Sequence, residues 1–125
     1  MEDLFIEGKG FIPKVELNAQ TGVLNFSGQS YHEYTDEFFD PIFAWISQYL
    51  KEPGKKITVN FRMTYFNTAS SKCFLEILEM LKAYQNNCGG QITVNWYYQA
   101  NDYDMLETGE DFIIDTQLNI NLIPY

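Results

Sequence analysis

The sequence predicts an α/β domain in which a mixed β-sheet carries its helices mainly on one face. From residue 35 onward, segments with the apolar spacing of an amphipathic helix alternate with segments that have the two-residue alternation of a strand. Three successive strands each keep one polar face, whereas a parallel strand buried on both faces is apolar throughout. We therefore expect helices to cover one side of the sheet and water to reach at least part of the other.

The N-terminal third of the chain predicts a hairpin and a first helix. Residues 4–6 form a short candidate edge strand. The segments 14–17 and 23–26 flank a Gly-containing loop, which is typical of a β-hairpin. A helix then begins near Thr35 or Asp36, either of which can cap it, and ends at a Pro-Gly pair.

The rest of the chain is organised around the stretch from Lys56 to Lys82. Its first half alternates apolar and polar residues, which predicts a half-buried strand, and its second half has the apolar spacing of a helix. The junction between them, residues 65–71, is rich in hydroxyl groups. A helix start offers unpaired amide N–H groups and the positive end of a dipole, so we expect function at this junction.

The C-terminal third predicts a strand, a helix and a last strand. Residues 91–98 alternate as a strand, and residues 101 to about 112 indicate a short acidic helix interrupted near Gly109. Residues 118–122 alternate as a final strand that Pro124 ends. Strand–helix–strand connections of this length make neighbouring strands parallel, with right-handed crossovers.

Composition and charge exclude several classes of function. The formal net charge of −9 repels nucleic-acid phosphates and anionic lipid heads, and a hydrophobic content of 46% is too high for a disordered chain. No apolar run reaches about 18 residues and no basic leader is visible, so we expect a soluble cytoplasmic protein. Cys73 and Cys88 form no CxxC pair and have no histidine nearby, which favours buried structural thiols over metal or redox chemistry.

Other features have ordinary structural explanations. The carboxylates between Asp102 and Asp111 would serve acid–base catalysis only if two of them shared a cleft, and a solvated acidic face is commoner. His32, the only histidine, supports neither a metal site nor a Ser-His-Asp arrangement. We therefore expect no cofactor and no metal. A small enzyme that uses the acidic cluster at Asp102–Asp111 stays the alternative.

The hydroxyl residues Thr68, Ser70 and Ser71 have two interpretations. In the first, Asn67 or Thr68 only caps the helix, with its side chain accepting a backbone N–H. In the second, one hydroxyl is a regulatory phosphorylation site, because a phosphate adds about −1.5 to −2 charge at pH 7 and is stabilised at a helix start. A partner packed on the junction would meet a buried dianion, whose desolvation costs several kcal/mol. The modification would thus switch binding and not folding.

At this junction the sequence resembles the SiaC family of bacterial regulatory phosphoproteins. Residues 65–72 look like the family's L-N-T-S-S-x-K segment, with Ala69 where the family often has Ser and Ser71 in place of an apolar residue. The resemblance covers nearly the whole chain, through Gly28, Ser30, Tyr31, Glu33, Phe39, Trp45, Ile77, Leu78, Gly89, Gly90, Trp96, Tyr97, Tyr98, Glu107, Glu110, Asp111 and Phe112.

The resemblance implies that residues 1–125 form a single SiaC-like domain with a fold similar to STAS domains. It also implies partner switching, in which a dedicated serine/threonine kinase phosphorylates the protein and a PP2C-type phosphatase removes the phosphate. The unphosphorylated form of a family member binds and activates a diguanylate cyclase, which makes cyclic di-GMP. The family's phosphorylated threonine matches Thr68. An anti-sigma factor, the partner of other STAS-type antagonists, is the alternative.

We therefore expect a non-enzymatic binding module that phosphorylation of Thr68 controls, and whose downstream effector is a protein such as a diguanylate cyclase. Asn67 would cap or shape the turn, while Tyr65 and Phe66 would form part of an apolar contact patch. The rim of that patch would consist of Ser70, Ser71 and Lys72.

Overall fold

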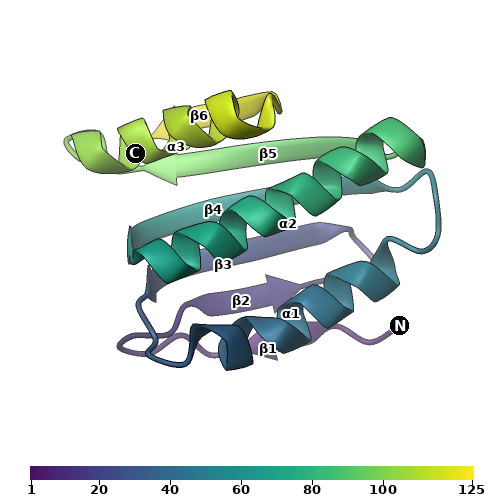
Figure 1. Cartoon of the computed structure of the whole chain (residues 1–125), viewed down its shortest axis with the longest axis horizontal. Coiled ribbons are helices and arrows are strands. Elements are labelled where there is room, and N and C mark those ends of the chain that lie inside the picture. Colours follow the sequence, from purple (N-terminus) through teal and green to yellow (C-terminus); the bar gives the residue numbers. More distant parts are fainter.

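In the computed structural model, which describes residues 1–125, six strands form one mixed sheet with three helices (Figure 1). The strands lie side by side in chain order: β1 (Leu4–Ile6), β2 (Lys14–Leu17), β3 (Val23–Ser30), β4 (Lys56–Phe66), β5 (Gln91–Tyr98) and β6 (Ile120–Pro124). The helices are α1 (Thr35–Tyr49), α2 (Thr68–Asn87) and α3 (Tyr103–Thr116). The first three strands are antiparallel, whereas β3 to β6 run parallel.

All three helices lie on the same face of the sheet (Figure 1), which confirms the predicted fold class. The cause is visible in β4, where Ile57, Val59 and Phe61 are at most 1% exposed while the polar residues between them are not buried. A cluster of 25 buried hydrophobic residues fills the space between sheet and helices. None of the helices combines the length and the apolarity that crossing a bilayer requires.

The face without helices carries a ladder of asparagine side chains. The Nδ2 of Asn60 donates to Oδ1 of Asn25, that of Asn95 to Asn60, and that of Asn121 to Asn95, each at 2.9 Å. The backbone register places these four residues opposite one another in β3 to β6. A slip of one residue in any strand would turn its asparagine to the other face, so the ladder favours a single register.

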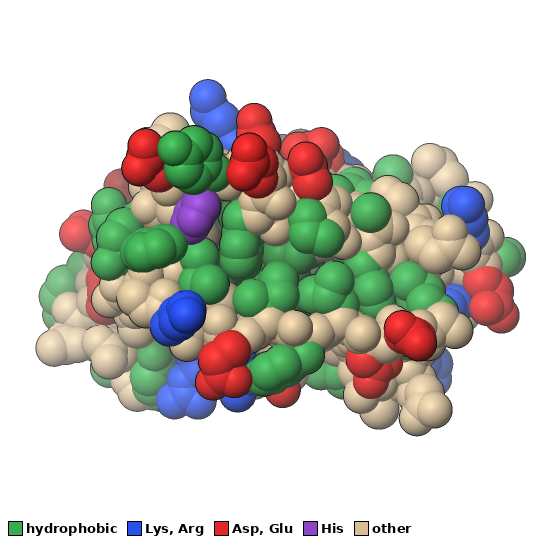
Figure 2. Space-filling model, turned by 90° about the horizontal axis from the view of Figure 1, so that it is seen from below, with side chains coloured by type: hydrophobic (Ala, Val, Ile, Leu, Met, Phe, Trp, Pro, Cys, Tyr) green, Lys and Arg blue, Asp and Glu red, His purple; other side chains and the backbone are tan.

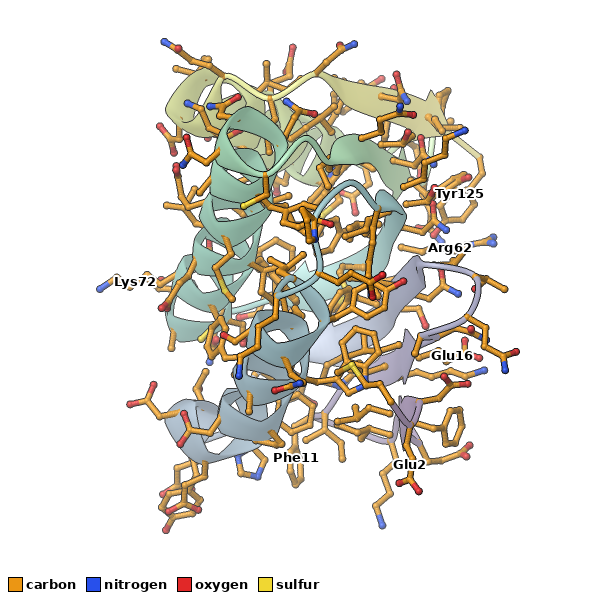
Figure 3. The ribbon with its side chains drawn as sticks, turned by 90° about the vertical axis from the view of Figure 1, so that its right-hand side faces the viewer. Glu2, Phe11, Glu16, Arg62, Lys72 and Tyr125 are labelled. Atoms are coloured by element: carbon orange, nitrogen blue, oxygen red, sulfur yellow. The ribbon has the colours of Figure 1, made fainter.

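Other polar side chains point to the same side as the ladder. Figure 3 shows Glu16, Arg62 and Tyr125 on the side of the sheet opposite the helices. The guanidinium carbon of Arg62 lies 4.1 Å from the ring centre of Tyr125, close enough for a cation–π interaction. The helix-free face is therefore mostly polar, as the alternation of residues in the strands predicts.

The capping predicted for the first helix is wrong. Tyr34 is the N-cap residue of α1, without a capping hydrogen bond from its side chain, and Thr35 is the first helical residue. The hydroxyl of Thr35 instead donates to the carbonyl of His32 at 2.7 Å, and the imidazole Nδ1 of His32 accepts the N–H of Tyr34 at 2.9 Å. The histidine thus accepts the N–H of the N-cap residue itself, and α1 has no side-chain cap of the kind that Thr35 or Asp36 was expected to supply.

The interruption predicted near Gly109 is also wrong, because α3 continues through this residue to Thr116. A Cβ added at Gly109 would lie 2.6 Å from Cδ1 of Trp96 and 2.8 Å from Cδ2 of Leu122. The glycine therefore allows α3 to approach β5 and β6 closely and does not break the helix. The last strand begins at Ile120, two residues later than predicted, because Gln117 turns the chain with a φ of 59°.

Replacing Gly109 with alanine will lower the free energy of unfolding by up to about 2 kcal/mol, because overpacking the contact with Trp96 costs about 1–3 kcal/mol. The gain of roughly 1 kcal/mol in helix propensity offsets only part of this cost. Urea denaturation followed by circular dichroism will measure it. The control Ser47→Ala, at an exposed position of α1, will change stability by less than about 0.5 kcal/mol. A Gly109→Ala variant at least as stable as the wild type would contradict the close approach.

Candidate functional site

Thr68 is the first residue of α2, at the end of the molecule where each of the three helices begins (left in Figure 1). Its side chain is exposed. Asn67 is the N-cap residue, and its side chain accepts the N–H of Ser70 at 2.9 Å. The prediction that Asn67 caps this helix is therefore confirmed. Because Asn67 already does so, the hydroxyl of Thr68 is free of a capping role.

Ser70 has a structural role, so the prediction that it lines an exposed rim is wrong. Its side chain is fully buried, and its Oγ donates to the carbonyl of Ser30 at 2.9 Å. The two hydroxyl oxygens lie 2.8 Å apart. Because each hydroxyl carries one proton, that of Ser30 donates in this second bond. Together with the N–H of Asn67, which donates to the same Ser30 carbonyl at 3.1 Å, these bonds join the end of β3 to the start of α2.

The other predicted contact residues differ in exposure. Tyr65 is 51% exposed, but Phe66 is half-buried and lies with its ring centre 5.1 Å from that of Phe74. Phe66 therefore belongs mainly to the packing between sheet and helices. Ser71 is half-buried, and Lys72 is exposed and points away from the sheet (Figure 3).

Next to the start of α2 lies a group of aromatic side chains that the sequence did not predict as a unit. The ring centre of Tyr65 is 5.7 Å from that of Tyr31, which is 6.3 Å from that of Phe11. Phe11 is 5.1 Å from His32, which is 5.8 Å from Tyr34. We call these five residues the aromatic cluster. In the sequence, only Tyr31, His32 and Tyr34 stand close together. Phe11 and Tyr65 come from distant segments, so no local pattern marks the whole cluster.

Two shallow hollows open at the aromatic cluster. The first has a volume of about 270 Å³ and lies among Phe11, Tyr31, His32, Glu33 and Tyr34. The second, of about 380 Å³, extends from residues 33–37 to Ala69, the neighbour of Thr68. Both are widely open to solvent. Their shape suits contact with a macromolecule better than enclosure of a small substrate.

The acidic segment forms no pair of carboxylates in an enclosed cleft. Asp102 accepts the N–H of Met105 at 3.0 Å and so caps α3. Asp102 and Asp104 line an open hollow beside Tyr65, whereas the acidic residues later in α3 are exposed on the helix surface. No group of three or more His, Cys, Asp or Glu side chains in the chain is arranged to hold a metal ion.

The two cysteines have different surroundings. Cys73 is buried in α2, and burial raises the pKa of its thiol from the usual 9.0 to about 11, with smaller contributions from Asp36, Glu76 and Asp40. Cys88 is exposed at the end of α2. The expectation of a buried structural thiol therefore holds for Cys73 and is wrong for Cys88.

The chain is similar to known proteins over nearly its whole length. A family model described as "SiaC family regulatory phosphoprotein" matches residues 6–125. An uncharacterized protein of Pseudomonas aeruginosa (strain UCBPP-PA14) is 30% identical over 113 residues, which are 90% of this chain and 88% of that protein.

Solved structures agree with this match. Apo-SiaC from Pseudomonas aeruginosa has a TM-score of 0.88 at 27% identity, over 98% of this chain and 99% of that one. A chain in the structure of the diguanylate cyclase SiaD in complex with its activator SiaC, from the same organism, has a TM-score of 0.90 at 27% identity, over 98% of this chain and 100% of that one.

The variant Ser70→Ala will lower the free energy of unfolding by about 1–3 kcal/mol, because it leaves the buried hydroxyl of Ser30 without its partner, while the Ser30 carbonyl keeps only the N–H of Asn67. Ser71→Ala, one position along and half-buried, is the matched control and will change stability by less than about 0.5 kcal/mol. Thermal and urea denaturation will compare them. Equal stability of both variants would show that the Ser30–Ser70 pair does not hold the junction together.

In the native protein at pH 8, one thiol will react with Ellman's reagent, and both will react after unfolding in guanidinium. The reason is that the thiolate is the reactive form, and the raised pKa of Cys73 keeps its buried thiol protonated at that pH. The variant Cys88→Ser will have no thiol that reacts in the native state. Reaction of two thiols at similar rates in the folded wild type would contradict the burial of Cys73.

Proposed function

Because this chain belongs to the SiaC family of regulatory phosphoproteins, we propose that it is a binding module whose contact with a partner is controlled by phosphorylation of Thr68. A serine/threonine kinase adds the phosphate and a PP2C-type phosphatase removes it. The chain itself catalyses nothing in this proposal and supplies only a surface. The observation that carries the proposal is the exposed side chain of Thr68 at the start of a 20-residue helix.

The start of α2 tolerates a phosphate on Thr68. The positive end of a helix dipole stabilises a nearby anion by about 0.3–1 kcal/mol, and the first turn of α2 contains no acidic residue. Lys72 lies four positions later, on the same side of the helix, and attracts the phosphate further. Since Asn67 and Ser70 make the bonds that hold the junction, phosphorylation leaves the fold intact.

The same phosphate excludes a partner that covers Thr68. In the sequence, Thr68 lies between Tyr65, which belongs to the aromatic cluster, and Ala69, which lines the second hollow. A protein packed over these residues would bury a dianion that has only the single charge of Lys72 opposite it, at a cost of several kcal/mol. The unphosphorylated form therefore binds the partner and the phosphorylated form releases it.

We propose a diguanylate cyclase as the partner. SiaC from Pseudomonas aeruginosa, to which this chain is similar in fold along its whole length, is the activator of the diguanylate cyclase SiaD. Binding by the unphosphorylated chain would then raise production of cyclic di-GMP. Because the kinase consumes ATP, the proposal places the chain in the cytoplasm.

Thr68→Asp will weaken binding to the cyclase at least tenfold, because it places a negative charge under the partner, whereas Thr68→Ala will bind as the wild type does. Isothermal titration calorimetry will measure both, and melting temperatures will confirm that the variants fold. Thr21→Asp, exposed in the loop after β2, is the control and will leave binding unchanged. Equal affinities for Thr68→Asp and Thr68→Ala would contradict the switch.

The site itself is tested by incubating the chain with its kinase and locating the phosphate by mass spectrometry. We expect the phosphate on Thr68, which is exposed, and not on Ser70, which is buried. Phosphate found solely on Ser71 or elsewhere would overturn the assignment. The unphosphorylated chain could instead capture an anti-sigma factor. In that case control by phosphorylation of Thr68 would still hold, but the regulated process would be transcription.

A further inference from the structure

We propose that the helix-free face of the sheet binds a sugar phosphate, with the phosphate held between Lys14 and Arg62 and the sugar hydroxyls held by amides of the asparagine ladder. The site lies on the other side of the sheet from the helices, and the proposal does not depend on phosphorylation of Thr68. Binding of a small ligand would be a second function of the chain, beside the proposed binding of a partner protein.

The charge of the chain is unevenly divided between the two sides of the sheet. The helices α1, α2 and α3 contain three, two and five acidic residues, against two lysines, both in α2. The six strands contain one acidic residue, Glu16, and three basic residues, Lys14, Lys56 and Arg62. Figure 2 shows a row of acidic side chains on the helix side, at the top, and basic side chains gathered at the lower left. The net charge of −9 therefore comes mainly from the helices, and the helix-free face can attract an anion.

Two of these cations stand on either side of a short polar side chain. The backbone register pairs Ser27 with Lys14 of β2 and with Arg62 of β4. In each of the three strands an adjacent residue is fully buried under the helices, so all three side chains point to the helix-free face. Because neighbouring strands lie about 4.8 Å apart, the two cationic side chains start about 10 Å from each other, with only the hydroxyl of Ser27 between them. We call these three residues the basic row.

The β1–β2 loop brings a third cation to the basic row. Lys9 lines a hollow of about 350 Å³ together with Lys14 and Ser27, which we call the loop hollow. The loop is held by two backbone hydrogen bonds of 3.1 Å between Lys9 and Ile12. Gly8 allows it to approach β2 closely, because an added Cβ would lie 2.6 Å from the backbone nitrogen of Lys14. The third cation is thus placed by the fold next to the other two.

The cations of this face have few partners within the chain. Neither of the two ion pairs includes Lys9 or Arg62. Lys14 lies 3.7 Å from Glu16, but both side chains are nearly half exposed, so this pair contributes little. Arg62 lies 4.1 Å from the ring centre of Tyr125, an uncharged group that leaves its positive charge uncompensated. Arginine binds phosphate through two parallel hydrogen bonds and lysine binds it as a point charge, so the basic row suits a phosphate dianion.

A second hollow beside the basic row suits the rest of the ligand. This ladder hollow has a volume of about 250 Å³ and shares Ser27 with the loop hollow. Its lining includes the amides of Asn25 and Asn60, the carboxylate of Glu16 and the ring of Tyr97. Amides donate and accept hydrogen bonds, and a carboxylate accepts two, which matches the neighbouring hydroxyls of a sugar. The ring of Tyr97 offers a flat apolar surface to the C–H groups of the sugar ring.

Both hollows are widely open to solvent, so charge and hydrogen bonds, and not enclosure, would hold the ligand. We therefore expect a dissociation constant of about 0.1–1 mM, which corresponds to a free energy of binding of modest size. Because the cations are exposed, salt will screen their attraction for the phosphate. Salt dependence is thus a signature of the proposed site.

The test is a titration of the isotope-labelled full-length chain with glucose 6-phosphate, followed by two-dimensional NMR. We expect saturable shifts of the backbone amides of Lys14, Ser27 and Arg62, and of Asn25 and Asn60. The affinity will fall at least about threefold between about 50 and 200 mM sodium chloride. Shifts that are absent from these strands, or that do not saturate, would overturn the proposal.

Variants separate a built site from general attraction of anions. Lys14→Gln and Arg62→Gln will each weaken binding at least about fivefold, because each removes one charge from the phosphate. Lys51→Gln, at an exposed position after α1, removes the same charge elsewhere and will leave binding unchanged. Ser27→Val keeps every charge but fills the gap in the basic row, so it will also weaken binding. Equal affinities for all four variants, with melting temperatures that show folded protein, would overturn the site.

Other ligands test the chemistry of the two hollows. Inorganic phosphate will bind more weakly than glucose 6-phosphate and will shift the basic row without the asparagines, whereas glucose alone will not bind. Inorganic phosphate that binds as tightly as glucose 6-phosphate would overturn the role of the ladder hollow. Tighter binding of adenosine monophosphate would overturn the sugar as the body of the ligand.

The result is independent of the proposed function. Thr68→Asp, which changes a residue at the start of α2, will bind glucose 6-phosphate as the wild type does. Loss of ligand binding in the variants of the basic row would therefore say nothing against the switch at Thr68, and failure of that switch would leave this site standing.

Discussion

The candidate site depends on the buried hydrogen bonds between Ser30 and Ser70. These two residues join the end of β3 to the first turn of α2, and apart from Phe11 every residue of the site lies within a few positions of one or the other. Tyr31 and His32 follow Ser30, while Thr68 and Ala69 precede Ser70. Without this connection the aromatic rings and the threonine would belong to two loops with independent positions. With this connection, the aromatic rings and the threonine form one surface, and the two segments that carry them have a fixed relative position.

Because all three helices cover the same face of the sheet, the segments that carry this surface meet at one end of the sheet. Because β3 to β6 are parallel and each crossover returns over the same face, α1, α2 and α3 all begin at the same end of the sheet (Figure 1). That end collects the connections that carry Tyr31, Thr68 and Asp102. The opposite end holds the β2–β3 turn, the connections from each helix to the next strand, and the N-terminus (Figure 1). A sheet covered on both faces would have divided these helix starts between two layers, and the rings of the aromatic cluster would not have met.

Local patterns predicted most of the fold and part of the site. The strand at residues 91–98, the strand–helix junction and the cap by Asn67 follow from alternation and side-chain chemistry within a few positions. What the sequence did not reveal depends on contacts between distant segments. Ser70 is buried because Ser30 lies against it, and Gly109 stays helical because Trp96 packs there. The aromatic cluster needs the β1–β2 loop beside the end of β3, and no local pattern carries that information.

The asparagine ladder explains how half of the sheet surface stays uncovered. The inner amide groups, those of Asn60 and Asn95, each use one N–H and one lone pair toward their neighbours, the outer two use one or the other, and all four keep further N–H groups or lone pairs for water. Stacking a second sheet on this face would remove that water from several amide groups at once, and burying such a group without a compensating hydrogen bond is costly. The strip is thus uncharged but strongly hydrated. The ladder therefore disfavours self-association through the helix-free face of the sheet, and it does so without charged side chains.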